Sequence, residues 1–227
     1  MGTRSLDDQF VGYRRKLIEQ IRKQGISDLE ILQTFDRVPR HIFVPEGVWP
    51  RAYEDAPIPI GYGQTASQPS LQALYLTLLK PTPDEKVLEI GTGSGYLTAL
   101  LGLMADRVYS VERVRDLSAR ARSALDTLGL NNVALLVGDG TIGWRKYAPF
   151  DVIVVSAAAP SIPQAILDQL GDPGRMLIPV GTRELQELVM VRKQDGEVTE
   201  EAIRGAVTFV PLLGRYAWTP EGGEGGQ

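Results

Sequence analysis

A glycine-rich turn is the part of this sequence whose residue types point most directly to ligand chemistry. It reads Gly91-Thr92-Gly93-Ser94-Gly95 and follows a short apolar segment. Glycine has no Cβ, so a turn of this composition lets the backbone bend sharply and approach a bound ligand. In parallel α/β sheets, ligands bind at such turns, beyond the carboxyl ends of the strands. The turn therefore marks a candidate cofactor site.

Two carboxylates follow the next two apolar segments, as the glycine turn follows the first. Glu112 follows residues 107–111, and Asp139 follows residues 133–137, between two glycines. The first can accept hydrogen bonds from both hydroxyls of a ribose, and the second can accept one from the exocyclic amine of a flat base. Taken singly, each is a common helix cap or a solvated charge. Their ordered recurrence after a glycine turn favours an adenosine ligand.

The same region argues against other nucleotide and metal sites. A dinucleotide-binding G-x-G-x-x-G pattern would place glycine at position 96, where the chain has Tyr96, so an NAD(P)-dependent oxidoreductase is disfavoured. No G-x-x-x-x-G-K-[ST] pattern occurs, so a P-loop is absent. The sequence has no cysteine and one histidine, His41, which excludes a cysteine nucleophile and argues against a bound metal.

Bulk composition narrows the classes further. The chain has 227 residues, 43% of them hydrophobic and 23% charged, which fits a globular protein with a real core. The formal net charge is -4 and the basic residues are scattered, so nucleic acid is not an expected partner. The sequence contains neither a secretory h-region nor an apolar run near the roughly 20 residues of a membrane helix. We therefore expect a cytoplasmic protein without a membrane partner.

Short apolar segments alternate with helical patterns and must position these groups. The expected strands cover residues 86–90, 107–111, 133–137, 151–155, 176–180, 188–192 and 206–210. Repeated strand–helix units predict an α/β fold with a doubly wound, mostly parallel, seven-stranded Rossmann-like sheet. Asp195-Gly196 predicts a hairpin and hence an antiparallel C-terminal edge. Helices are expected over residues 7–24, over 71–79 and over 163–170. A short helix is expected between a Ser27 cap and Pro39. Another helix should begin at Tyr96, and a further one should follow the strand at 107–111 and end at about residue 128.

Residues 39–70 interrupt this regularity. Their prolines and glycines forbid long regular elements. Their aromatic and aliphatic residues indicate packing, and a long packed loop in a compact domain is usually functional. We expect one domain over residues 1–220, with an N-terminal helical and loop extension (1–70, including a lid at 53–70) and a cofactor-binding core (71–220). Residues 221–227 are Gly-rich and are expected to be disordered.

Sequence blocks outside the glycine turn carry a family resemblance. They are Val38-Pro39-Arg40-His41-Ile42-Phe43-Val44-Pro45, residues 53–59, Gly63-Gln64-Thr65-Ala66-Ser67-Gln68-Pro69, residues 151–163, Ile178-Pro179-Val180-Gly181 and Phe209-Val210-Pro211-Leu212. With the glycine turn they make the chain similar to class I S-adenosylmethionine methyltransferases. Over residues 10–218 it resembles the protein-L-isoaspartate O-methyltransferases. Ala66, Ser70 and Arg175 depart from the family pattern, which bears on substrate preference and not on reaction class.

The resemblance implies a reaction and a set of site residues. The family transfers a methyl group from S-adenosylmethionine to the free carboxylate of L-isoaspartyl residues in damaged proteins and peptides. It leaves S-adenosylhomocysteine and an ester that collapses to a succinimide, which starts repair; no metal is implied. The implied cofactor contacts are Gln64, Thr65, Ser67, Gly91, Gly93, Ser94, Gly95, Glu112, Arg113, Asp139 and Gly140. The implied substrate contacts are Thr65, Ala66, Ser67, Val210 and Pro211, with Ser67 as the active-site serine.

This chemistry suits a chain that is poor in histidine and cysteine. A carboxyl group like that of aspartate has a pKa near 4 and is ionised at neutral pH, so it needs no general base. Excluding water and aligning oxygen, methyl and sulfur would supply most of the acceleration. Two further interpretations stay open: a methyltransferase that acts on a small molecule or RNA, and a non-catalytic binding module that keeps the fold.

Overall fold

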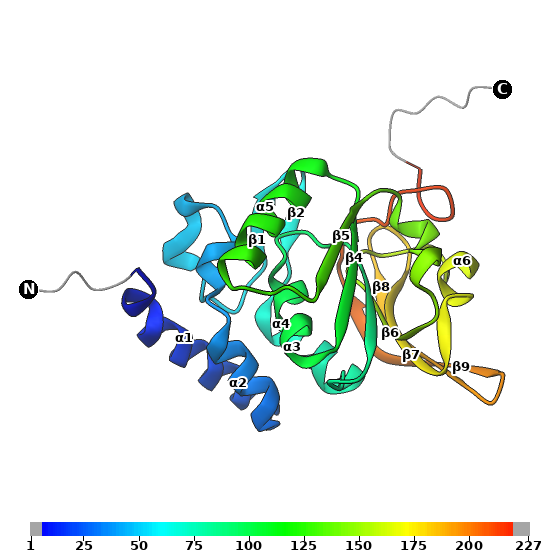
Figure 1. Ribbon diagram of the computed structural model, residues 1–227, viewed down its shortest axis with the longest axis horizontal. Coiled ribbons are helices and arrows are strands. Elements are labelled where there is room, and N and C mark those ends of the chain that lie inside the picture. The colour runs from blue at the N-terminus through cyan, green and yellow to red at the C-terminus, as the bar shows by residue number, and fades with distance from the viewer. Residues whose placement is uncertain (1–5, 220–227) are drawn as a thin grey trace, which may run out of the picture.

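A seven-stranded sheet forms the centre of the molecule, in the order β5-β4-β3-β6-β7-β8-β9 (Figure 1). The computed structural model describes residues 6–219, without the side chains of residues 6–8 and 204–206. Neighbours from β5 to β7 are parallel, whereas β8 pairs antiparallel with β7 and β9. This confirms the expected fold class; the expected tail at 221–227 lies outside the described residues. The strands are β3 (Lys86–Ile90), β4 (Arg107–Glu112), β5 (Val133–Val137), β6 (Phe150–Val155), β7 (Leu170–Gly181), β8 (Gln186–Gln194) and β9 (Glu197–Val207).

Successive side chains of the inner strands point to opposite faces of this sheet, as the pleat of a β-strand requires. Val87 and Val152 belong to a core on one face, whereas their neighbours Leu88 and Ile153 belong to a second core on the other. All four side chains are fully buried. Because both faces are covered, these strands appear in the sequence as continuous apolar runs rather than as alternating patterns.

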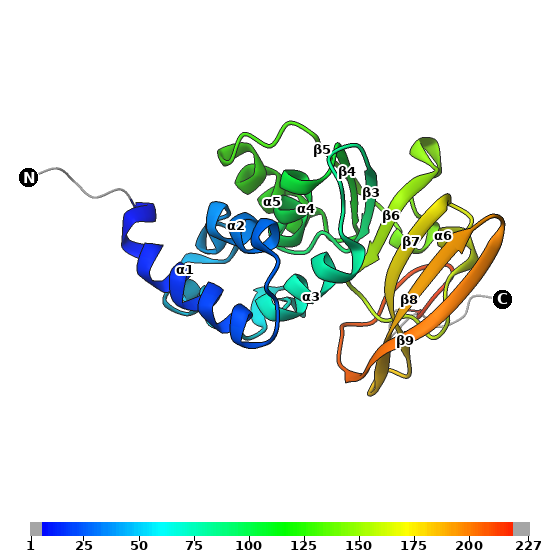
Figure 2. The ribbon, with the colours of Figure 1, turned by 90° about the horizontal axis from the view of Figure 1, so that it is seen from below.

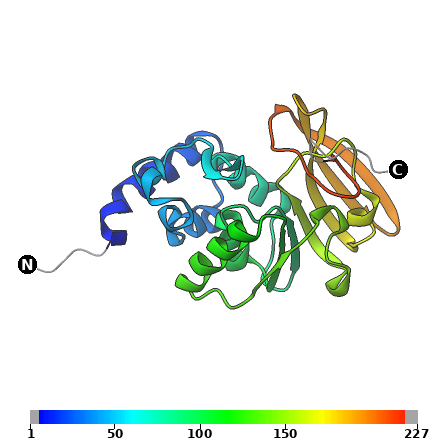
Figure 3. The same cartoon turned by 90° about the horizontal axis from the view of Figure 1, so that it is seen from above.

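Helices cover the two faces unequally. On the first face lie α3 (Pro69–Leu79), α4 (Tyr96–Met104) and α5 (Arg115–Thr127), with α1 (Leu6–Lys23) and α2 (Leu29–Arg37) packed against them. In the described residues, the second face carries the short helix α6 (Gln164–Leu167) and the 3-10 turns η3 (Gly140–Ile142) and η4 (Arg145–Tyr147). Figure 2 shows α6 across the sheet from α4 and α5. The N-terminal helices and the β8–β9 hairpin lie at opposite ends of the molecule (Figure 3).

Two helix boundaries differ from the sequence prediction. Asp28, not Ser27, caps α2, because its carboxylate accepts hydrogen bonds from the backbone N–H groups of Glu30 (3.0 Å) and Ile31 (3.4 Å). The helix predicted over 163–170 is shorter, because Leu170 already begins β7. Among residues 6–219, no helix combines the length and the apolar character that a membrane span needs.

The C-terminal hairpin forms at the predicted turn, but its second strand was misplaced. Asp195-Gly196 joins β8 to β9, and the carboxylate of Asp172 accepts hydrogen bonds from both backbone N–H groups of the turn (2.8 and 2.7 Å). The strand therefore continues directly from the turn over Glu197–Val207, not over 206–210. Residues 208–210 leave the sheet and are free to line the site described below.

Residues 39–70 contain more structure than their prolines suggested. Two 3-10 helices, η1 (Arg40–Phe43) and η2 (Glu46–Arg51), are followed by a small antiparallel hairpin of β1 (Ile58–Gly61) and β2 (Gln64–Ala66). None of these four elements exceeds six residues, which agrees with the effect of proline on regular structure.

The register of the sheet brings the carboxyl ends of three strands together. Ile90 of β3 lies opposite Val111 of β4 and Val155 of β6. The pairing continues one residue further: Gly91 N–H donates to the Val111 carbonyl and Ser156 N–H donates to the Ile90 carbonyl, both at 2.8 Å. Because β4 and β6 flank β3 on opposite sides, the strand order reverses here, which is where a ligand crevice opens in such sheets.

Candidate cofactor and acceptor site

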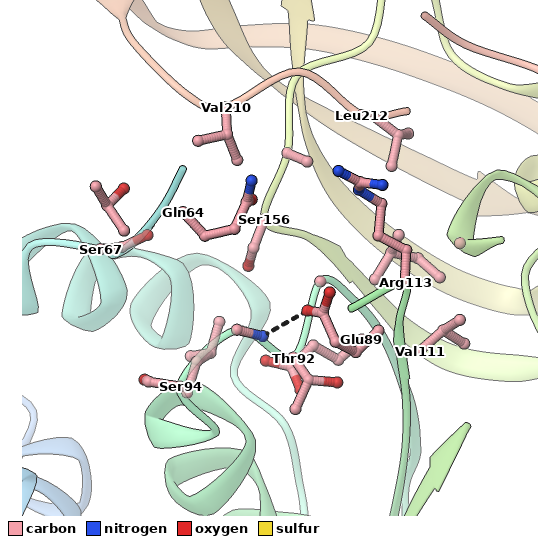
Figure 4. A pocket seen from close by; sticks show the side chains of 18 of the residues that line it. Gln64, Ser67, Glu89, Thr92, Ser94, Val111, Arg113, Ser156, Val210 and Leu212 are labelled. Carbon is pink, nitrogen blue, oxygen red and sulfur yellow. Dashed lines mark hydrogen bonds between the residues drawn. The ribbon is translucent and has the colours of Figure 1, made fainter. Parts of the chain in front are cut away.

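A cavity opens at this reversal of strand order (Figure 4). Its walls come from β2, α3, the glycine turn, the ends of β4 and β6, the start of η3 and the segment after β9. All the predicted site residues line it except Gly95 and Asp139. The lining residues are Gln64, Thr65, Ala66, Ser67, Gln72, Glu89, Ile90, Gly91, Thr92, Gly93, Ser94, Leu97, Val111, Glu112, Arg113, Gly140, Ser156, Ala157, Val210, Pro211, Leu212 and Leu213.

Glu112 lies at the end of β4 and is 6% exposed. Its Oε2 accepts a hydrogen bond from Gly93 N–H at 2.9 Å, and its Oε1 accepts one from Val114 N–H at 2.8 Å. A carboxylate oxygen can accept two hydrogen bonds, so each oxygen of Glu112, which lines the cavity, retains one acceptor site. The pair of remaining sites matches the two adjacent hydroxyls of a ribose.

The glycine turn supplies the floor of the cavity. Gly91 has φ +93°, a conformation that residues with a side chain rarely adopt, and a Cβ there would lie 3.5 Å from the Cβ of Ser156. The turn therefore needs glycine at this position for its backbone shape, whereas the approach to Ser156 is an ordinary van der Waals contact. Thr92, which the sequence reasoning passed over, is buried, and its Oγ1 lies 2.5 Å from Oγ of Ser110.

The two predicted residues outside the lining have other contacts. A Cβ on Gly95 would lie 2.8 Å from the Cβ of Ala121, so this glycine permits close packing of α4 against α5. The Oδ1 of Asp139 accepts hydrogen bonds from the backbone N–H (2.8 Å) and the hydroxyl (2.6 Å) of Thr141, and its Oδ2 accepts one from Arg215 N–H (2.8 Å). The cofactor contact of each remains a prediction.

Glu89 is a cavity residue that the sequence reasoning missed. It is 0% exposed, and its Oε2 accepts hydrogen bonds from the hydroxyls of Thr98 (2.5 Å) and Ser110 (2.6 Å). Its Oε1 has no partner in the described part of the chain. Burial raises the pKa of Glu89 to about 7; the two hydroxyl groups oppose this rise, and the charge of Glu112 adds to it. The available signal was a carboxylate between two apolar residues of a strand, Leu88 and Ile90.

Gln72 is a second residue that was missed, and it too has a buried side-chain oxygen without a hydrogen-bond partner. It projects from α3, is 5% exposed, and its Oε1 has no partner among residues 6–219. Unpartnered buried oxygens cost free energy unless a ligand or water satisfies them. Gln72 and Glu89 thus give the cavity two buried acceptor oxygens that need a hydrogen-bond donor. Within the described residues, no group of three or more His, Cys, Asp or Glu is placed to hold a metal ion.

A second cavity adjoins the first. The two share Thr65, Ser67, Ser156 and Val210. None of the described residues that line the second cavity carries a charge, and five of them bear hydroxyl groups. The lining consists of Pro57, Thr65, Ser67, Gln68, Ser70, Leu71, Ser156, Val207, Thr208, Phe209 and Val210. The pair of cavities can hold two ligands end to end, with the four shared residues around the junction.

Arg40 fixes the segment that carries Ser67. Its guanidinium is fully buried and donates hydrogen bonds to backbone carbonyls spread over residues 52–67, including that of Ser67 at 3.0 Å. Burial lowers the pKa of Arg40 to about 10, so it stays charged at neutral pH; the nearby Tyr96 and Asp55 oppose the decrease. One cation therefore ties together the backbone of residues 52–67, most of the segment that was predicted to be a lid.

The β1–β2 hairpin is attached separately to α5. The hydroxyl of Tyr62, at the tip of the hairpin, donates a hydrogen bond to the carboxylate of Asp116. The guanidinium of Arg120 lies over the Tyr62 ring and donates to the Ile60 carbonyl at 2.9 Å. Gln64 and Thr65 follow in β2 and line the cavity, so these contacts help to position one of its walls.

Comparison with known proteins identifies relatives of this arrangement. Residues 13–217 match the family model described as protein-L-isoaspartate(D-aspartate) O-methyltransferase. A protein-L-isoaspartate O-methyltransferase of Geobacter metallireducens is 49% identical over 210 residues, covering 92% of this chain and 97% of that protein. One of Methanoculleus marisnigri is 48% identical over 209 residues, covering 92% and 94%.

Solved structures agree with the sequence comparison. A protein-L-isoaspartate O-methyltransferase structure superposes with a TM-score of 0.81 at 29% identity, covering 90% of this chain and 67% of that one. A structure from Plasmodium falciparum, described as a putative protein-L-isoaspartate O-methyltransferase in complex with S-adenosyl-L-homocysteine, has a TM-score of 0.79 at 26% identity. It covers 88% of this chain and 98% of the other.

Proposed function

Because this chain belongs to the protein-L-isoaspartate(D-aspartate) O-methyltransferase family, we propose that its two adjoining cavities hold the methyl donor and the acceptor of that reaction. The enzyme methylates the free carboxylate of L-isoaspartyl residues with S-adenosylmethionine, and so starts their repair. The observation that carries the assignment of cavities is the junction: four residues belong to both, and one cavity offers acceptors that fit an adenosine.

The first cavity fits S-adenosylmethionine, which supplies a methyl group on a positively charged sulfur. The free acceptor sites of Glu112 match the ribose hydroxyls. The unpartnered oxygens of Gln72 and Glu89 suit the positively charged amino group of the methionine part. Apolar side chains beside Gly140 would pack against the adenine, and Asp139 would accept from its amine through the free site on Oδ2.

The second cavity suits an acceptor that is already anionic. Its described lining residues are uncharged, so no cation of the protein competes for the electrons of the attacking oxygen. Ser67, which lines both cavities, would orient the carboxylate with its hydroxyl, while Arg40 holds the Ser67 backbone in place. No group is required to remove a proton, because the acceptor is ionised at neutral pH. Thr65, Ala66, Val210 and Pro211 would border the peptide.

We further propose that isoaspartyl-containing peptides and damaged proteins are the partners of the enzyme, and that nucleic acid and membranes are not. We also propose that the enzyme works in the cytoplasm and forms one domain over residues 1–220. The family relationship and the uncharged acceptor cavity support the first part. The net charge of -4 and the absence of a membrane-spanning helix among residues 6–219 are consistent with the rest.

Two peptides of identical composition test the assignment. One carries isoaspartate and the other aspartate, and both are incubated with the enzyme and methyl-labelled S-adenosylmethionine. Label is expected in the isoaspartyl peptide, as a base-labile ester that releases methanol. A displacement of about 1 Å can cost on the order of 100-fold in rate, so the aspartyl peptide should remain nearly unlabelled. Equal labelling of both peptides, or label that survives mild alkali, would contradict the proposal.

A further inference from the structure

Ser156 joins the two cavities from the side of the sheet. It directly follows β6 and lines both cavities. Its backbone N–H donates to the Ile90 carbonyl at 2.8 Å, which fixes its position against the end of β3. Figure 4 shows Ser67 and Ser156 on different walls of the site, one in the segment after β2 and the other at the end of β6. Sequence reasoning did not select Ser156 individually.

The acceptor cavity restricts what can hold a carboxylate. Its described lining residues include no cation, so neutral donors must do this. The Gln68 amide is engaged with Ser70 (2.8 Å) and with Asp55 (3.1 Å), and neither Ser70 nor Thr208 reaches the cofactor cavity. Hydroxyl groups at the junction therefore remain as the candidates for contact with the reacting carboxylate.

Three hydroxyl residues line the junction, and two of them are suitably placed. Thr65 is exposed, whereas Ser67 and Ser156 are half-buried. The Ser156 hydroxyl forms no hydrogen bond within the described part of the chain. A hydroxyl in a crevice without a partner is free to donate to a ligand, and a bond from it to a charged oxygen is about twice as strong as one between neutral groups.

We propose that Ser156 holds the acceptor carboxylate from the sheet side, by donating a hydrogen bond to the oxygen that does not take the methyl group. This rests on the proposed function of the second cavity. Ser67 holds the same carboxylate from the opposite wall. As the new oxygen–carbon bond forms and the sulfur–carbon bond breaks, Ser156 keeps its proton, so no proton is transferred. Two fixed donors stop the carboxylate from rotating about its bond to the α-carbon.

The test compares full-length Ser156→Ala, Ser156→Thr and wild-type enzyme on the isoaspartyl peptide with labelled S-adenosylmethionine. Ser156→Ala is expected to lower kcat/KM by roughly 10- to 100-fold, the range for a hydrogen bond to a charged group. The Kd for S-adenosylhomocysteine and the Tm should stay at wild-type values. Ser156→Thr keeps the hydroxyl and should retain most of the rate. Ser161→Ala, the same change at an exposed position of the same segment, is the matched control.

A double variant separates the proposed role from a merely additive one. If Ser67 and Ser156 hold one carboxylate together, the loss in Ser67→Ala/Ser156→Ala should be smaller than the product of the single losses. Multiplying losses, or a Ser156→Ala loss confined to cofactor affinity, would overturn the inference. So would wild-type rates in Ser156→Ala while the wild-type enzyme labels the peptide. A wild-type enzyme that leaves the peptide unlabelled would overturn the proposed function and this inference with it.

Discussion

The backbone N–H of Gly93 donates a hydrogen bond of 2.9 Å to Oε2 of Glu112, so the glycine turn and the proposed ribose acceptor hold each other in place. The partner oxygen, Oε1, is fixed in the same way by Val114 N–H at 2.8 Å. A carboxylate held at both oxygens presents its remaining acceptor sites in fixed directions. Glu112 therefore contributes to the local structure of the turn as well as to the ligand site.

Replacement of Glu112 should weaken cofactor binding and loosen the turn together. Glu112→Ala is expected to cost about 1.5–3 kcal/mol in affinity for S-adenosylhomocysteine, the range for hydrogen bonds to a charged group, and also to lower the Tm without ligand. Calorimetry and thermal unfolding measure the two effects. Glu187→Ala, at an exposed position of β8, is the control and should change neither. Wild-type affinity in Glu112→Ala would remove this residue from the site.

Ser67→Ala should separate catalysis from cofactor binding. Arg40 holds the Ser67 backbone through its carbonyl, so loss of the hydroxyl should leave the loop in place. We expect turnover of the isoaspartyl peptide to fall about 10-fold or more, with the Kd for S-adenosylhomocysteine nearly unchanged, which is the pattern of an interaction made mainly in the transition state. Steady-state kinetics at saturating cofactor tests this. A variant with wild-type turnover would make Ser67 an ordinary turn residue.

Arg40→Lys should loosen residues 52–67 although it keeps the charge. Lysine has one nitrogen in place of the planar guanidinium and cannot reach carbonyls spread over residues 52–67 at the same time. Buried carbonyls left without donors cost about 1–3 kcal/mol each. We therefore expect a lower Tm and a higher KM for the peptide. The exposed Arg37→Lys, on the last turn of α2, is the matched control; equal behaviour of the two variants would contradict the role of Arg40.

Glu89 should make stability depend on pH. Its pKa is about 7 in the folded protein against 4.5 as the ordinary value. Between these values the unfolded chain has released the proton while the folded protein keeps it, so the free energy of unfolding falls as pH rises from about 4.5 to 7 and then levels off. Glu89→Gln removes this contribution and should be more stable than wild type at pH 8 by up to about 3 kcal/mol.

Denaturant titrations of Glu89→Gln and wild type between pH 5 and 8 measure this difference. Glu187→Gln, an exposed carboxylate replaced in the same way, serves as the control and should follow the wild-type curve. Parallel curves for Glu89→Gln and wild type would mean that Glu89 titrates normally.

The central strands could be predicted from the sequence because both faces of the sheet are buried. Residues 86–90 were bounded correctly, and so were residues 133–137 of the edge strand β5, because all five residues of β5 are apolar. In contrast, β9 is an edge strand with exposed residues such as Glu200 and Thr199, so its residues carry no apolar pattern and its span was missed. The β1–β2 hairpin was missed for a related reason, because Pro59 lies within it and its short strands are supported by tertiary contacts such as that of Arg120.

The site residues also divide into those that a local sequence pattern predicted and those that only the fold brings to the site. Those that belong to a local pattern, such as Gly91, Gly93 and Glu112, were found from their spacing, and they line the cavity. Gln72 enters the site from α3 and Ser156 from the residue after β6, and neither has a local pattern that distinguishes it from ordinary polar residues. Their contribution depends on the register of the sheet and on the packing of α3, which only the fold provides.

An acceptor cavity whose described lining residues are all uncharged also favours release of the product. Before transfer, the positive charge that attracts the carboxylate is the one on the neighbouring sulfur. The carboxylate is therefore retained while S-adenosylmethionine is bound. After transfer neither the sulfur nor the ester is charged, and the ester keeps only the weak hydroxyl contacts of residues such as Ser67. The attraction that holds the peptide in the site therefore disappears when the methyl group is transferred. An enzyme whose product must go on to cyclise in water gains from a site that holds unmodified chains and discharges modified ones.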